Sequence, residues 1–166
     1  MKKYDIAIVG ITGLPSEYGG FETLCDNLCK YLSKKYSILV FCSTDKNHKL
    51  KTKEYKFGDR FFIPIKANGI NSIPYEIISL VIAIFKSDKI FICGLASCIT
   101  IPFLKIVFRK KVFFTHIDGL EHRREKWNFL AKIYLSISRS LALKYSDYII
   151  LDNKELNKYI KGKKRF

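Results

Sequence analysis

The first 23 residues place a glycine-rich turn between a strand and a helix, and this order restricts the chain to few folds. Residues 4–9, YDIAIV, form a short apolar run typical of a buried strand. The next segment, GITGLPSEYGGFET at 10–23, is rich in glycine and leads into an amphipathic helical pattern over 20–34. A strand, a tight turn and a helix in this order are typical of the opening of a βαβ unit, so the pattern predicts a parallel sheet.

The rest of the chain repeats this alternation. Strands are expected at 4–9, 37–42, 60–65, 89–93, 111–115 and 147–151. Helices are expected at 20–34, 73–86, 96–108 and 124–145, with a short extra strand at 53–57 and a short helix near 153–161. The strands are rich in Ile, Val, Phe and Tyr with little strict alternation, as in strands covered on both faces. The pattern therefore predicts an α/β fold with a Rossmann-like, three-layer α/β/α arrangement around a mostly parallel sheet.

The length and the charge narrow the classes of protein. The 166 residues suffice for one core and are too few for two typical domains, so we expect a single domain over 1–166. The net charge is +15, and residues 105–166 hold sixteen Lys and Arg against six Asp and Glu. Such an excess attracts anionic lipid, nucleic acid or phosphate-bearing substrates, although a solvated basic face is an ordinary alternative. No basic and aromatic RNA-binding motif is present, so nucleic acid is not an expected partner.

The cysteines and the apolar stretches indicate a cytoplasmic protein. The five cysteines lie outside any CxxC or zinc-like spacing, so we expect free thiols in a reducing compartment. The apolar start is too short for a signal peptide. The apolar stretches 73–85 and 90–108 are too short or too interrupted to span a membrane, so buried core elements explain them better.

The glycine-rich segment is the first candidate site. Gly13, Gly19 and Gly20 allow the backbone to approach a ligand, and the start of the following helix favours an anion such as phosphate. The segment is not the dinucleotide fingerprint GxGxxG, because Pro15 stands at the sixth position, and it lacks the GK[ST] of a P-loop. A purely structural tight turn remains open as its role.

The second candidate site is HIDGLEHRREKW at 116–127, which follows the strand-like run KVFFT. A carboxylate such as Asp118 or Glu121 beside cations could deprotonate a hydroxyl, and Arg124 could take phosphate charge. The ordinary alternative is that Glu121 pairs with Arg124 at a helix start and that Asp118 bonds its own loop.

These segments, together with ICGLAS at 92–97 and SDYIILDNKEL at 146–156, resemble the N-terminal half of bacterial GT-B glycosyltransferases. The resemblance is to the family 4 type enzymes with the DUF1972 domain, which include capsule and O-antigen rhamnosyltransferases, and it covers essentially the whole chain. Family members usually have Asn in place of His116 and an aromatic residue in place of His122. The first departure leaves the role of His116 open, and the second concerns packing.

The resemblance implies one half of a GT-B fold, the acceptor-binding domain, with the C-terminal donor-binding domain absent. It implies that Gly13, Gly19 and Gly20 approach the diphosphate of a nucleotide-sugar donor, and that Glu121 and Arg124 contact substrate. Asp118 is the first candidate for the catalytic base and His116 the second. No metal or cofactor is expected, and no DxD pair is present. The implied acceptor is a lipid-linked saccharide, which places the protein at the anionic inner face of the cell membrane.

Three interpretations remain open at this stage. The chain is a truncated part of a glycosyltransferase, without turnover by itself, or it is one subunit of a split enzyme whose donor-binding half is a separate chain. The third is a non-catalytic basic module that binds membranes or polyanions.

Overall fold

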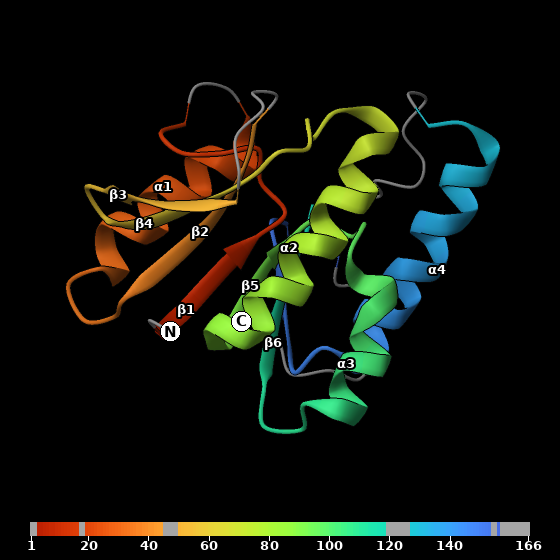
Figure 1. The fold of residues 1–166 in the computed structure, drawn as a ribbon. Helices are drawn as coiled ribbons and strands as arrows, with labels where there is room; N and C mark the ends of the chain where they lie inside the picture. The colour runs from red at the N-terminus through yellow and green to blue at the C-terminus, as the bar shows by residue number, and fades with distance from the viewer. Residues whose placement is uncertain (1–2, 17–18, 45–49, 119–126, 154–155, 157–166) are drawn as a thin grey trace.

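The fold is built on a seven-stranded sheet in the order β3-β4-β2-β1-β5-β6-β7 (Figure 1). The computed structural model describes residues 3–16, 19–44, 50–118, 127–153 and 156. The strands are β1 (Tyr4–Val9), β2 (Ile38–Ser43), β3 (Lys51–Tyr55), β4 (Gly58–Ile63), β5 (Ser87–Cys93), β6 (Val112–Ile117) and β7 (Tyr148–Leu151). The ladders are parallel except for the edge pair β3–β4. This confirms the predicted α/β class and the mostly parallel sheet.

Helices cover both faces of the sheet. They are α1 (Gly20–Leu32), α2 (Ser72–Lys86), α3 (Ile101–Val107) and α4 (Phe129–Tyr145), with 3-10 turns η1 (Gly69–Asn71) and η2 (Cys98–Thr100). The strand order places α1 on one face and α2, α3 and α4 on the other, since parallel crossovers are right-handed (Figure 1).

The observed bounds of most elements differ from the predicted ones by one or two residues, and the following three are among those that differ. The helix expected at 124–145 begins at Phe129, because the Asn128 side chain accepts a hydrogen bond from the Ala131 N–H at 2.8 Å and caps it. The helix expected at 96–108 is divided into η2 and α3. The extra strand expected at 53–57 is β3, at Lys51–Tyr55, and it turns into β4 at Gly58. The helix expected near 153–161 lies almost entirely outside the described residues.

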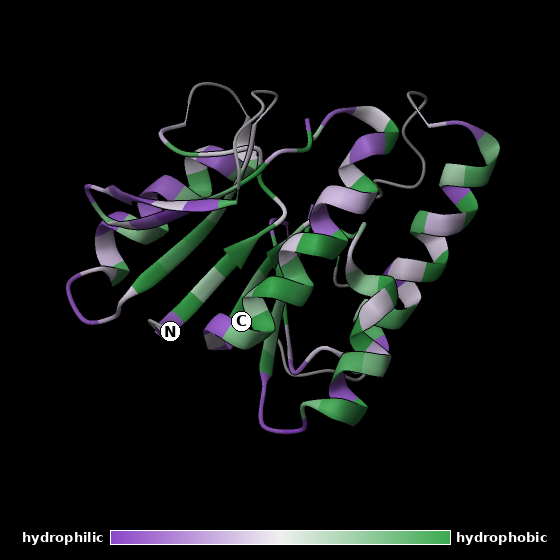
Figure 2. Ribbon diagram, viewed as in Figure 1, coloured by the Kyte–Doolittle hydropathy of each residue, from purple (hydrophilic) through white to green (hydrophobic). Residues whose placement is uncertain are grey.

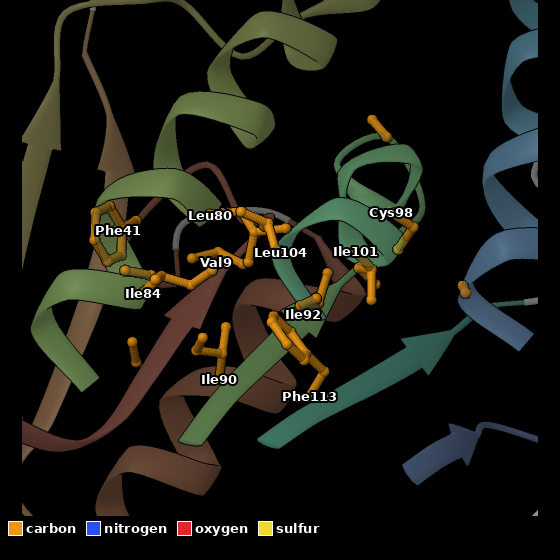
Figure 3. Packing of buried hydrophobic residues seen from close by; sticks show 14 of the residues in the cluster. Val9, Phe41, Leu80, Ile84, Ile90, Ile92, Cys98, Ile101, Leu104 and Phe113 are labelled. Carbon is orange, nitrogen blue, oxygen red and sulfur yellow. The ribbon is translucent and has the colours of Figure 1, made fainter. Parts of the chain in front are cut away.

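The core has two layers because alternate residues of each strand face opposite sides. Ala7 and Val9 of β1 pack in the larger layer, under α2, α3 and α4 (Figure 3). Ile8 belongs to the smaller layer under α1. Four of the five buried free cysteines, Cys25, Cys29, Cys42 and Cys93, are in the smaller layer.

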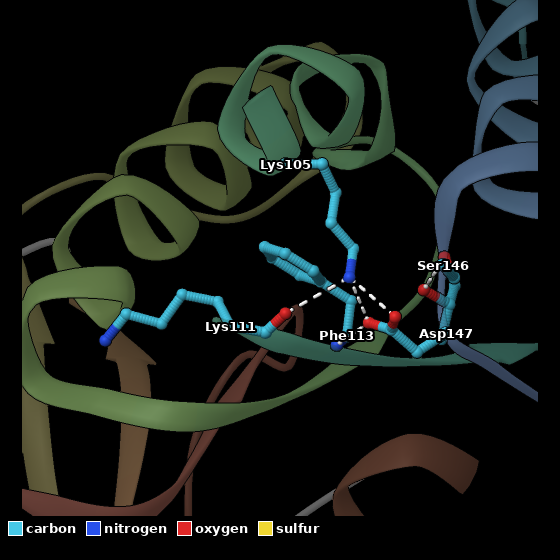
Figure 4. A network of polar contacts seen from close by, with 6 residues as sticks. Lys105, Lys111, Phe113, Ser146 and Asp147 are labelled. Atoms are coloured by element: carbon cyan, nitrogen blue, oxygen red, sulfur yellow. Dashed lines mark hydrogen bonds and ion pairs between the residues drawn. The ribbon is translucent and has the colours of Figure 1, made fainter. Parts of the chain in front are cut away.

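A polar network joins α3 to the sheet (Figure 4). The Lys105 ammonium contacts both oxygens of Asp147, at 2.6 and 2.5 Å, and the Lys111 carbonyl at 3.1 Å. The Asp147 carboxylate also accepts the Phe113 N–H at 2.8 Å. This network fixes the end of α3, the start of β6 and the chain before β7 together.

Helix α2 is apolar over most of its length (Figure 2). In the described part of the chain, the stretch Gly69–Lys86 is long and apolar enough to cross a membrane by length and composition. Within α2, however, Tyr75, Leu80, Ala83 and Ile84 are buried in the larger core layer. One side of α2 therefore packs on the sheet, whereas its other side, with Ile78, Val81 and Phe85, is exposed.

Candidate functional site

A cavity of about 610 Å³ opens at the carboxyl edge of the sheet. The ends of β1, β5 and β6, the start of α1 and the start of α2 contribute to its walls, as do Asp152 after β7 and Trp127 before α4. In open parallel sheets this edge, outside the carboxyl ends of the strands, is where ligands bind. The fold thus places this cavity where a substrate site is expected.

The glycine-rich segment forms one wall. Gly10 has a φ of +88°, and a Cβ there would lie 1.9 Å from the Cys93 carbonyl oxygen, so glycine lets the turn after β1 lie against the end of β5. Gly19, with a φ of +120°, and Gly20 both line the cavity. Gly13 does not, because it faces the Cys42 side chain in a neighbouring, shallower pocket.

A buried carboxylate stands beside the glycines. Glu22, in the first turn of α1, is only 8% exposed, and its Oε1 accepts hydrogen bonds from the Thr12 N–H at 2.9 Å and the Thr12 hydroxyl at 2.6 Å. A Cβ on Gly19 would lie 2.1 Å from its Oε2. The helix start that the sequence suggested as a phosphate cradle therefore already has a protein carboxylate next to it, which favours a ligand other than a bare anion there.

His116 at the end of β6 is held on three sides. Its Nε2 donates to Asp152 Oδ1 at 2.6 Å, and the side chain is 3% exposed. The edge of Phe21 contacts the ring with centroids 5.3 Å apart, and Phe91 stacks on it at 6.3 Å. Its Nδ1 is buried and has no hydrogen-bond partner among the described residues. The aspartate fixes the orientation of the ring, as carboxylates do for catalytic histidines.

Four carboxylates meet at the cavity. Asp118 follows β6, Asp152 follows β7, and Glu22 and Glu76 come from α1 and α2. Glu76 Oε2 accepts the Ser97 N–H at 3.3 Å. No Lys or Arg lines the cavity within the described part of the chain. The described walls are therefore anionic, in contrast to the chain as a whole.

Tyr75 forms the floor of the cavity. It is fully buried, and its hydroxyl lies 2.7 Å from the Ile11 carbonyl and 3.0 Å from the Phe41 carbonyl. Burial raises the pKa of the Tyr75 phenol well above its usual value. The side chain is therefore a neutral donor that ties α2 to the ends of β1 and β2.

The structure brings some of the predicted site residues together. Asp118, His116, Gly19 and Gly20 line one cavity, whereas Gly13 lines the neighbouring pocket. Glu121 and Arg124 lie outside the described residues.

Sequence reasoning missed three acidic residues of the cavity, Glu22, Glu76 and Asp152. Asp152 could have been found, because it directly follows the last predicted strand and so had to lie at the carboxyl edge. Glu22 belongs to the GGFET motif, but the glycines of this motif gave the stronger signal, and a single glutamate at a helix start is common. Glu76, inside an apolar helix, gave no signal besides its own charge. Between residues 3 and 153, outside the gaps in the description, no group of three or more His, Cys, Asp or Glu side chains is placed to hold a metal ion.

Comparisons with known proteins define the class of the domain. The fold is similar to a solved fragment of sucrose-phosphate synthase from Thermosynechococcus elongatus, with a TM-score of 0.59 over 97% of this chain and 84% of that one. The two sequences are 8% identical, so the likeness is one of fold alone, a Rossmann-like α/β fold. The family model described as "Domain of unknown function (DUF1972)" matches residues 3–165, and the chain belongs to this family. No curated protein matches the sequence.

Proposed function

We propose that the protein is the acceptor-binding half of a glycosyltransferase, in which the cavity at the carboxyl edge of the sheet holds the sugar that receives the new residue. The observation that carries the proposal is the set of four carboxylates around one cavity. Carboxylates accept short, charge-assisted hydrogen bonds from hydroxyl groups, and a saccharide presents many of them. The glycosyltransferase-like fold supports the same class of activity.

The acidic walls restrict the class of acceptor. A uronic acid or a sugar phosphate would bring a further negative charge beside Glu22 and Asp118, and in a partly enclosed cavity such repulsion is only weakly screened. The acceptor unit that fits is neutral or carries an amine. The alternative of a non-catalytic polyanion-binding module finds no support at this cavity, because the same carboxylates would repel a polyanion.

In the proposed reaction, Asp118 is the base. Its carboxylate takes the proton from the attacking hydroxyl of the acceptor while that oxygen bonds to the anomeric carbon of the donor sugar. The bond from this carbon to the diphosphate oxygen breaks, and the nucleoside diphosphate leaves with its electron pair. His116, oriented by Asp152, is the second candidate for the base.

The donor would be a nucleotide-sugar bound largely by a second domain, on the same chain or on a separate subunit, that faces the cavity. The family resemblance brings Gly19 and Gly20 near the diphosphate, and because Glu22 beside them would repel it, Arg124 would have to offset the charge of both. Rhamnose as the transferred sugar, and a lipid-linked saccharide of a capsule or O-antigen as the acceptor, follow from the family resemblance. Without such a domain, residues 1–166 would show no turnover, since most of the donor contacts would be missing.

The test is a transfer assay in which the chain is combined with the donor-binding domain of a family member, with labelled nucleotide-sugars and lipid-linked acceptors. Asp118→Ala should lower turnover about 100-fold, because loss of a general base has this size of effect. Acceptors ending in a neutral sugar should be used in preference to those ending in a uronic acid.

The matched control is Glu54→Ala, which removes an exposed carboxylate from the edge strand β3, far in sequence from the cavity residues. It should leave turnover unchanged. Near-normal turnover of Asp118→Ala would show that Asp118 is not the base and would leave His116 as the candidate. Absence of transfer to every acceptor by the unsubstituted chain in combination with the donor-binding domain would contradict the proposed function itself.

A further inference from the structure

The outer sides of α3 and α4 leave an unusual amount of apolar surface in contact with solvent. In α3, Phe103 and Ile106 are 67% and 70% exposed, and in α4, Phe129 and Leu130 are 75% and 74% exposed. Further exposed apolar side chains on these helices are Val107, Ile133 and Ile137. We call these seven residues the α3–α4 surface.

The exposed residues lie on one side of each helix. In α4, the spacing 129, 130, 133 and 137 places the side chains on a single stripe, opposite the buried Ala131, Leu135, Ser138 and Ala142. The two helices pack against each other on the same face of the sheet (Figure 1). The exposed stripes thus belong to two neighbouring helices, and Figure 2 shows hydrophobic residues along most of α3.

Cations outnumber anions in the segments that form this surface, and the Asp147 carboxylate, directly after α4, is paired with Lys105 of α3. The sequence contains no Asp or Glu from residue 98 to residue 117 or from residue 126 to residue 146. The same segments contain exposed cations near the C-terminal ends of the helices, Arg109 and Lys110 after α3 and Lys144 in α4. This excess of cations complements a negatively charged partner surface.

We propose that the α3–α4 surface docks on an anionic lipid bilayer. Exposed Phe, Leu and Ile side chains enter the acyl boundary, and the cations lie at the level of the negatively charged headgroups. Trp127, which lines the cavity, lies two residues before Phe129, so this surface borders the cavity that the proposed acceptor would enter. The exposed apolar side chains and the excess of cations support this docking surface, and vesicle binding can be measured independently of sugar transfer.

The experiment is sedimentation of the full chain with vesicles of phosphatidylcholine alone or with phosphatidylglycerol. Binding should require the anionic lipid and weaken as salt is raised, because the electrostatic part is screened. The double variant Phe129→Ser, Leu130→Ser should lower the partition coefficient more than 10-fold, since two large apolar side chains no longer enter the bilayer. Both residues are exposed, so the fold should persist, and circular dichroism checks this.

The matched control is Tyr31→Ser, which removes an exposed aromatic ring, 66% exposed, from α1 on the opposite face of the sheet. It should leave vesicle binding unchanged. A second pair of double variants tests the contribution of the cations. Arg109→Glu with Lys144→Glu should reduce vesicle binding more than about 10-fold. Lys34→Glu with Lys35→Glu, near the end of α1, should reduce it much less.

Three results would overturn the proposal. One is the absence of vesicle binding by the unsubstituted chain at low salt. Another is equal loss of binding in the α3–α4 variants and in their α1 controls, which would indicate attraction by net charge alone. The third is a dimer in sedimentation velocity that the Phe129→Ser, Leu130→Ser variant dissociates, because the surface would then be covered by a second copy of the chain.

Discussion

Gly10 is the residue at which the cavity and the sheet depend on one another. It ends β1 with a left-handed backbone and brings the glycine-rich turn against the Cys93 carbonyl at the end of β5. A side chain at this position would push the turn away from β5 and would open the wall that Thr12 and Glu22 form. The fold itself therefore requires a residue without a Cβ at position 10, whether or not a ligand binds.

Gly10→Ala and Gly20→Ala form a matched pair that tests this view. Gly10→Ala should lower the free energy of unfolding by more than about 3 kcal/mol or prevent folding, because the new Cβ meets main-chain atoms in a strained backbone. Gly20, at the start of α1, has no atom within 4 Å of an added Cβ. Gly20→Ala should therefore be neutral or stabilise by up to about 1 kcal/mol.

Urea denaturation of both variants provides the measurement. Equal stability of Gly10→Ala and the unsubstituted protein would mean that the turn can move away from β5 without cost. A large loss of stability in Gly20→Ala would mean that the start of α1 is more crowded than its surroundings indicate.

At the scale of residues, the sequence predicts only part of the site. Asp118 and His116 could be predicted because they follow a strand directly, and the ends of parallel strands share one edge. The hydrogen bond from His116 to Asp152 could not, because it joins two strands whose adjacency is a property of the sheet order. The burial of Glu22 likewise depends on the exact path of the turn around Thr12.

At the scale of elements, the network around Lys105 explains how a helix of seven residues holds its place. Helix α3 is too short to be stable from helix propensity alone, so its position depends on tertiary contacts. Ile101 and Leu104 are buried in the larger core layer, and Lys105 binds the Asp147 carboxylate. The ion pair thus links α3 to the chain that enters β7.

Lys105→Ala should lower the free energy of unfolding by about 1–3 kcal/mol, because charge-assisted hydrogen bonds to a partly buried carboxylate are lost. The matched control is Lys110→Ala, which removes an exposed ammonium from the turn after α3 and should change stability by less than about 0.5 kcal/mol. Thermal and urea unfolding measure both. Equal effects of the two substitutions would show that the Lys105–Asp147 pair contributes nothing beyond general charge.

The elements themselves were largely predictable, for a physical reason. The strand predicted at 37–42 is an almost continuous apolar run, because both faces of β2, a central parallel strand, are buried, so composition alone identifies it. The bounds were less predictable where one side chain decides them. Asn128 starts α4 five residues later than the helical periodicity suggests, and Gly58 begins β4 earlier by closing a turn from β3.

At the scale of the whole molecule, the two core layers differ in chemistry. The layer under α1 contains four cysteines, with Cys25 Sγ 3.3 Å from Cys93 Sγ, and Cys98 lies in the other layer. Burial raises the pKa of Cys29 to about 12 and the pKa of Cys42 to about 11. Thiols with such pKa values are protonated at neutral pH, and only the thiolate is a nucleophile.

We therefore expect no thiol of the native protein to react with an aromatic disulfide reagent at pH 8 within minutes. All five should react once the chain is unfolded in guanidinium chloride. Absorbance of the released thiolate gives the number directly. Rapid reaction of one or more thiols without denaturant would show that the layer under α1 opens readily in the native state.

The order of the strands in the sheet also affects folding during synthesis on the ribosome. β1 leaves the ribosome well before β5, one of its two neighbours, which follows about 80 residues later with Ser87 beside Tyr4. At a synthesis rate of roughly 5–20 residues per second, β1 waits about 4 to 16 s with one edge unpaired. During that interval the nascent chain is a substrate for chaperones, and the speed of translation between β1 and β5 becomes a determinant of yield.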